Sequence, residues 1–128
     1  MNKLANWLII LCPLSGCISS NKPTFPVSIS ASGIDDACGG IGIVVANTAD
    51  KVAIFSHPEN DSRELVQLKI GSKVLLCDEE NGWYGVIIPR KGVQCISDEE
   101  NSDRQPINYS GPCESGWIEK LYVEFLAG

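Results

Sequence analysis

The stretch SKVLLCDEENGWYGVII, residues 72–88, decides the fold class of this chain. It contains two β-rich runs, SKVLLC and WYGVII, separated by an acidic turn that ends in Asn81-Gly82. An Asn-Gly pair between such runs is a strong signal for a tight hairpin, and Pro89 ends the second run because proline cannot donate to a strand ladder. The stretch therefore predicts a hairpin whose return strand, opened by Trp83, is a central strand of the fold.

Short apolar runs continue on both sides of this hairpin, with turn residues between them. The expected strands are GIVVA (42–46), KVAIF (51–55), ELVQLKIG (64–71), GWIE (116–119) and VEFL (123–126), and KLY (120–122) is expected to form a single helical turn. No stretch has helical periodicity, and the connection over residues 89–113 is polar and irregular. Short strands with turns every eight to twelve residues predict an all-β fold, either a small barrel or a sandwich.

Two of the three tryptophans, Trp83 and Trp117, directly follow a glycine. A strand that passes a tight barrel corner needs a residue without a Cβ atom, which glycine supplies. A tryptophan placed directly after that corner can cover the open end of a barrel or fill its core. The repeated Gly-Trp step therefore favours the barrel.

The order and spacing of these segments resemble the bacterial Src-homology-3-like domain over about residues 38–126. The matching features are a β-branched first strand, a loop with Pro58, the segments IGSKVLLC and NGWYGVII, and the closing segment SGWIEKLYVEF. The closing segment of that family is a Gly-Trp-Val strand, a short helical turn with an aromatic residue, and a final strand. The resemblance implies an all-β Src-homology-3-like β-barrel of short antiparallel strands over residues 38–128, with a long disulfide-closed loop.

The chain departs from this family in two places. The first loop reads FSHPENDSRE, where the family usually has an arginine-rich stretch with Gly-Pro, and the connection between Ile88 and Trp117 is long and carries two cysteines. Any ligand preference inherited from the family is therefore in doubt.

Five aromatic residues are candidates for a ligand groove: Trp83, Tyr84, Tyr109, Trp117 and Tyr122. Src-homology-3-like folds take extended peptides in such a groove, and related bacterial domains are linked with cell-wall peptides. The alternative is that the two tryptophans lie mostly in the core.

The first residues of the chain are an export signal. Lys3 precedes an apolar run from Leu4 to Leu14, which is too short to span a bilayer as a helix, and small residues follow it. The tetrapeptide Leu-Ser-Gly-Cys, ending at Cys17, resembles the lipobox of bacterial lipoproteins. That resemblance implies removal of residues 1–16 and lipidation of Cys17, and two or three acyl chains anchor a protein firmly. The alternative is an ordinary secreted protein cut nearby.

The residue after Cys17 is Ile18, where an Asp would resemble an inner-membrane retention signal. We therefore expect a lipid anchor in the outer membrane and a domain in the periplasm. The serine-rich segment up to residue 37 is expected to be a flexible tether, so that residues 17–37 link the lipid to the domain. The alternative for part of it is an edge strand over residues 27–29.

Four cysteines remain after the signal and Cys17 are set aside: Cys38, Cys77, Cys95 and Cys113. An even number of cysteines in an oxidising compartment indicates two disulfides, for which three pairings exist. We favour Cys95–Cys113, which closes the polar insertion at its base, and hence Cys38–Cys77.

The composition argues against several functions. A net charge of −6 and a pI of about 4.6 disfavour nucleic acid and anionic membrane surfaces as partners. His57 is the only histidine, and the cysteines form neither a catalytic pair with it nor a zinc cluster. The two DEEN strings, at 78–81 and 98–101, lack the spacing of a calcium loop and are expected to be solvated acidic turns.

The sequence thus predicts a non-catalytic envelope lipoprotein that needs no cofactor or metal and binds a protein or a peptidoglycan peptide. The alternative is a structural subunit of an envelope-spanning secretion or conjugation assembly.

Overall fold

The computed structural model describes residues 22–30, 38–102 and 105–127. The expected signal peptide, Cys17 and the tether residues 18–21 and 31–37 lie outside the described residues. The strands are β2 (Ser28–Ile29), β3 (Gly40–Val44), β4 (Lys51–Phe55), β5 (Glu64–Lys69), β6 (Lys73–Glu80), β7 (Trp83–Ile87), β8 (Ile107–Asn108), β9 (Ser115–Glu119) and β10 (Val123–Ala127). A short helix α1 (Asp98–Ser102) and a 3-10 turn η1 (Lys120–Tyr122) complete the described elements.

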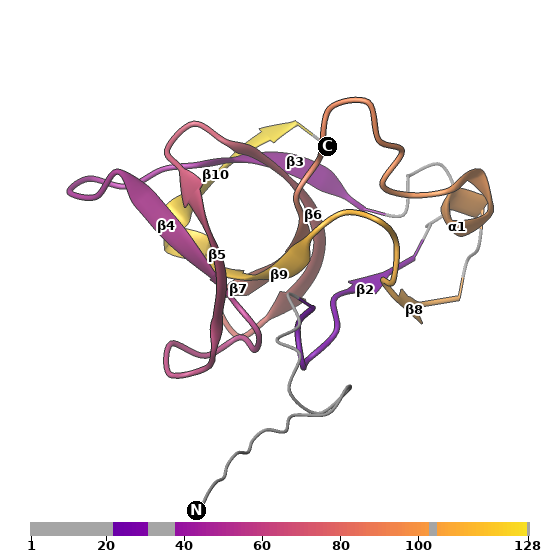
Figure 1. Cartoon of the computed structure of the whole chain (residues 1–128), viewed down its shortest axis with the longest axis horizontal. Helices are drawn as coiled ribbons and strands as arrows, with labels where there is room; N and C mark the ends of the chain where they lie inside the picture. Colours follow the sequence, from indigo (N-terminus) through magenta and orange to yellow (C-terminus); the bar gives the residue numbers. More distant parts are fainter. Residues whose placement is uncertain (1–21, 31–37, 103–104, 128) are drawn as a thin grey trace, which may run out of the picture.

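The fold is mostly β and antiparallel, as predicted. Seven strands form one sheet in the order β10-β3-β6-β7-β9-β4-β5, and β2 pairs with β8 in a second, two-stranded sheet. Figure 1 shows the larger sheet curving round the core. Its two edge strands, β5 and β10, do not pair with each other, so the sheet stays open. The expectation of a closed barrel is therefore corrected to a curled, open sheet.

The predicted hairpin is confirmed. The strands β6 and β7 pair with Glu80 opposite Trp83, which leaves Asn81 and Gly82 as a two-residue turn. Both turn residues have positive φ, 43° and 89°, the combination that matches the natural twist of the two strands. The strand β6 also runs further than expected, because the acidic residues before the turn belong to the ladder.

The main core lies on the concave face of the curled sheet. Burial alternates along β3 and along the first half of β6, as it does in strands with one solvated face. The core residues are Val44, Val52, Ile54, Leu68, Val74, Leu76, Val86 and Ile118. Each such side chain contributes about 1.5–3 kcal/mol when fully removed from water, so this cluster is the principal source of stability.

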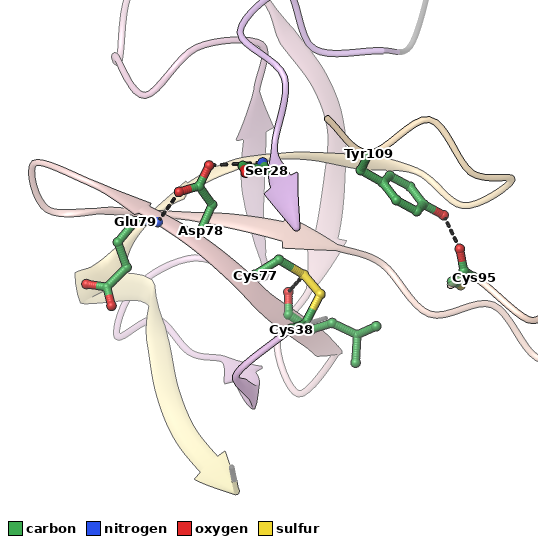
Figure 2. Close-up of a disulfide and its surroundings, with 8 residues drawn as sticks. Ser28, Cys38, Cys77, Asp78, Glu79, Cys95 and Tyr109 are labelled. Atoms are coloured by element: carbon green, nitrogen blue, oxygen red, sulfur yellow. Dashed lines mark hydrogen bonds between the residues drawn. A yellow bond between two sulfur atoms is a disulfide. The ribbon is translucent and has the colours of Figure 1, made fainter. Parts of the chain in front are cut away.

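Residues 22–30 pack on the sheet, which corrects the expected tether. Val27 and Ile29 are buried, with exposed fractions of 0% and 1%, and Ser28 pairs with Asn108 of β8. The Ser28 amide also donates to the Asp78 carboxylate at 3.0 Å (Figure 2). The alternation of two apolar residues around a polar one makes this segment a strand, as the alternative interpretation proposed.

The two predicted disulfides are confirmed. Cys38, just before β3, is bonded to Cys77 of β6 (Figure 2), and Cys95 is bonded to Cys113. The second bridge closes the insertion that carries α1 and β8. Closing a loop with a sequence separation of 18 contributes about 3 kcal/mol by restricting the unfolded chain.

Candidate functional site

The structure does not assemble the five candidate aromatics into one groove. Trp117, Trp83 and Tyr109 are buried, with exposed fractions of 0%, 7% and 8%. In a small domain the largest apolar side chains are needed inside, because few other residues bury as much area. These three residues are therefore structural in this fold, which leaves Tyr84 and Tyr122 as the half-buried members of the set.

The two tryptophans and Val27 form a small core of their own. The Phe55 ring meets the Trp83 ring edge-on at 5.7 Å between centroids, and the Phe25 ring meets Trp117 in the same way at 5.4 Å. The Trp117 indole N–H donates to the Phe25 carbonyl oxygen at 2.7 Å. This cluster fastens residues 22–30 to the sheet.

The two glycines before the tryptophans have different roles. Gly82 has a positive φ of 89° in the hairpin turn. Gly116 lies within the sheet, where a Cβ atom would sit 2.5 Å from Ile54 Cγ2 and 3.0 Å from the Phe55 carbonyl oxygen. The first glycine of the Gly-Trp repeat is therefore required by a turn, and the second by the close approach of two strands.

Tyr109 binds the two ends of the polar insertion together. Its hydroxyl donates to the Cys95 carbonyl oxygen at 2.7 Å (Figure 2) and accepts from the Cys113 amide at 3.1 Å. Burial raises the pKa of Tyr109 above its ordinary value, and the charge of Glu100 adds to that rise. From its buried position the hydroxyl thus bonds both ends of the insertion, which gives it a structural role.

Tyr122 borders a cleft of about 500 Å³ between η1, β4 and the loop that joins β3 to β4. The cleft walls include Val45, Val52, Phe55, Leu121 and Tyr122, with Lys51 and Glu119 at its polar parts. The Val45 amide donates to the Tyr122 carbonyl oxygen at 2.9 Å, which fixes the 3-10 turn against the loop. Leu121 is left 67% exposed beside it.

The lining of this cleft is mixed. Beside its aliphatic and aromatic residues the lining includes Asn47, Thr48 and Asn60 and the oppositely charged Lys51 and Glu119, so a ligand there would meet hydrogen-bonding groups as well as apolar ones. Of the residues singled out in the sequence, it contains only Tyr122. Leu121 and Phe55 were missed because nothing local distinguishes them from strand residues, although the predicted turn at residues 120–122 marked the place.

Tyr84 lies away from this cleft, beside a second hollow. That hollow, of about 470 Å³, is lined by Gly39, Gly40, Leu76, Cys77, Asp78, Glu79, Tyr84 and Phe125. Lys120 Nζ forms an ion pair with the Glu79 carboxylate and lies 5.0 Å from the centroid of the Tyr84 ring. The hydrogen bond from Lys120 to Glu79 raises the pKa of Lys120 above its ordinary value.

The acidic strings have structural partners. Asp78 accepts the amides of Ser28 and Glu79 (Figure 2), and the second string forms α1 behind a Ser97–Glu100 capping box. Over residues 22–30, 38–102 and 105–127, no group of three His, Cys, Asp or Glu side chains is placed to hold a metal ion. His57 is half-buried, and its ring centroid lies 6.1 Å from that of Phe25.

Within the same described ranges, no helix is both long and apolar enough to cross a membrane. Comparison of the chain with protein-family models, with curated proteins and with solved structures finds no match.

Proposed function

We propose that this chain is a lipid-anchored envelope protein whose Src-homology-3-like domain binds an extended peptide, of a protein or of peptidoglycan, without catalysis. The observation that carries the proposal is the cleft beside Tyr122, with its mixed apolar and polar lining and the exposed Leu121 at its edge. A preformed cleft in which polar groups accompany apolar walls is a usual form of a ligand site.

The order of the last elements supports the fold assignment. The strand β9 contains Gly116 and Trp117, the 3-10 turn η1 contributes the aromatic Tyr122, and β10 follows directly. This is the closing pattern on which the family resemblance rests. The sheet is open between its unpaired edges β5 and β10, and β4 joins β9 through the single pair Phe55 and Trp117.

The two disulfides support an oxidising compartment, because such bonds persist outside the cytosol. The Leu-Ser-Gly-Cys stretch adds the membrane anchor at Cys17, five positions before Lys22. A fully extended chain of that length spans at most about 18 Å. With residues 22–30 packed on the sheet, the domain would stand close to the lipid surface and not at the end of a long tether.

The second candidate function is a structural subunit of an envelope assembly. The exposed apolar side chains Leu121, Phe125 and Leu126 favour it, with exposed fractions of 67%, 60% and 49%. Leu121 belongs to η1 and the other two to β10, which follows it directly, and exposed apolar side chains are available to a protein partner.

Sedimentation with purified peptidoglycan sacculi tests the first proposal against the second. We expect the full-length chain in detergent to co-sediment, and Leu121→Glu to abolish co-sedimentation by placing a charge in the cleft. Ile70→Glu is the matched control, because Ile70 is also exposed and apolar but lies outside the cleft. Failure of the wild type to bind sacculi would exclude the peptidoglycan peptide and leave a protein partner, and equal loss in both variants would refute the cleft as the site.

A further inference from the structure

The two open edges of the sheet differ in the protection that they carry. The β5 edge bears Glu64, Gln67 and Lys69, the kind of charged and polar side chains that prevent edge strands from pairing with other chains. The β10 edge bears one charged residue, Glu124, and a register shift between Phe125 and Ala127, and its side chains Phe125 and Leu126 are 60% and 49% exposed. Because side chains alternate between faces, apolar groups are exposed on both faces of β10.

Among the described strands, β10 has a neighbour on one side only, so some of its backbone groups point away from β3. Tyr122 lies opposite Val45 and is hydrogen-bonded to it, because the Val45 amide donates to the Tyr122 carbonyl. Along an antiparallel ladder, hydrogen-bonded pairs alternate with pairs that are not hydrogen-bonded. In the register Val123 opposite Val44 and Phe125 opposite Gly42, Glu124 is therefore the residue that bonds to β3. The Val123 amide donates to the Lys120 carbonyl. The Val123 C=O and the backbone N–H and C=O of Phe125 therefore point away from β3.

The surroundings of this edge favour a cationic partner. Phe125 forms one wall of the hollow that also contains Tyr84, Asp78 and Glu79. Gly40 has no side chain to fill the space, and the Phe125 ring lies directly over its backbone. The Lys120 ammonium contacts two residues that line this hollow, the Glu79 carboxylate and the Tyr84 ring, so this pair of groups suits a cation. Glu124 on the strand itself adds a carboxylate to this edge, and the whole chain has a net charge of −6.

We propose that β10 accepts an extended partner segment with alternating apolar and basic side chains as an additional strand. The backbone of the partner pairs with the outward groups of Val123 and Phe125. Its apolar side chains cover Phe125 and Leu126, and a basic side chain lies opposite Glu124 or enters the hollow beside Tyr84. This surface shares no lining residue with the Tyr122 cleft, so it is a second binding site, independent of the first.

Hydrogen exchange with a synthetic probe tests the proposal on the full-length chain in detergent. The probe is a blocked heptapeptide of alternating valine and lysine, and we expect it to slow exchange of the Phe125 amide. A peptide with glutamate in place of lysine is expected to bind at least about tenfold more weakly, because it meets a surface of the same sign. A lysine peptide with methylated backbone nitrogens, which cannot form the ladder, is expected not to protect this amide.

Two variants with the same added charge locate the site. Phe125→Lys places a charge on the β10 edge and is expected to abolish protection, whereas Gln67→Lys places it on the β5 edge and is expected to leave protection unchanged. Equal binding of the glutamate peptide, equal binding of the methylated peptide, or no protection at Phe125 would each overturn the proposal. Slow exchange at Phe125 without peptide, together with a doubled mass in solution, would identify a second copy as the occupant and would also overturn it.

Discussion

The indole N–H of Trp117 donates to the carbonyl oxygen of Phe25 at 2.7 Å, across 92 positions of sequence. Their rings also meet edge-on, with centroids 5.4 Å apart. Trp117 is completely buried in β9, so it holds the first described segment against the middle of the large sheet. Residues 22–30 therefore pack with the strands of the domain, although they precede Cys38 in the chain.

Trp117→Phe tests this docking, because it keeps an aromatic ring and removes the donor. We expect the free energy of unfolding to fall by about 1–3 kcal/mol, since the Phe25 carbonyl loses its partner. The Phe25 amide, which donates to the Ser56 carbonyl at 3.1 Å, is expected to exchange faster. Trp83→Phe is the matched control, because the Trp83 indole has no hydrogen bond within the described residues and its loss should not speed that exchange. Equal acceleration in both variants would refute the specific role of the Trp117 donor.

Gly116→Ala is predicted to be strongly destabilising. Its new methyl group would meet Ile54 Cγ2 at 2.5 Å and the Phe55 carbonyl oxygen at 3.0 Å, and the backbone of β4 would have to move. Such overpacking costs about 1–3 kcal/mol. Gly39→Ala is the control, since a Cβ there meets nothing within 4 Å and is expected to be tolerated. Urea denaturation measures both, and a Gly116→Ala protein as stable as the control would show that the close packing of β4 on β9 is wrong.

Tyr109→Phe is predicted to loosen the closed insertion and to change its response to alkaline pH. Its hydroxyl bonds two backbone groups, so its loss costs about 1–3 kcal/mol at neutral pH. Burial raises the pKa of Tyr109 in the folded state, so the unfolded chain releases the proton first as the pH rises. The stability due to neutral Tyr109 is present below its ordinary pKa of 10.0 and is lost above it.

The raised pKa of Lys120 also makes the folded state lose stability as the pH rises. The measurement is therefore the difference in the free energy of unfolding between wild type and Tyr109→Phe from pH 8 to 11, because Lys120 is present in both proteins. The two stabilities should converge as the pH rises above about 10. A difference that stays constant across this range would contradict the assignment.

The parts of the structure that sequence reasoning predicted depend on local signals. The hairpin follows from Asn81-Gly82, and the disulfide pairing follows from the need to close one long insertion. The helix α1 had a readable signal that was missed, because Ser97 and Glu100 form a capping box three residues apart.

The parts that were not predicted depend on distant contacts. The burial of Val27 is decided by tryptophans far along the chain, and local composition marked its segment as a tether. VEFL at residues 123–126 reads as an ordinary strand, because a strand's sequence does not say whether it lies at an edge. The Gly-Trp steps likewise do not show whether a tryptophan lies in the core or in a groove, because that depends on residues distant in the sequence.

Cys17→Ser is predicted to release the protein from the membrane. The Leu-Ser-Gly-Cys stretch motivates this prediction, because the thiol is the group that would carry the diacylglycerol. Fractionation should place the variant in the soluble envelope fraction, and its mass should lack the acyl chains found on the wild type. Intact-mass analysis that finds no acyl chains on the wild-type protein would exclude lipidation.

Site-specific photo-crosslinking from position 121 in the native envelope tests the central claim, that the cleft beside Tyr122 binds an extended peptide. Leu121 is 67% exposed at the edge of that cleft, so a photoreactive residue there can reach a bound ligand without disturbing the core. A photoreactive residue in place of Ile70, which is exposed elsewhere, is the control. The account predicts a discrete adduct from position 121 whose mass identifies a peptide, and none from position 70. No adduct from position 121, or the same adducts from both positions, would contradict it.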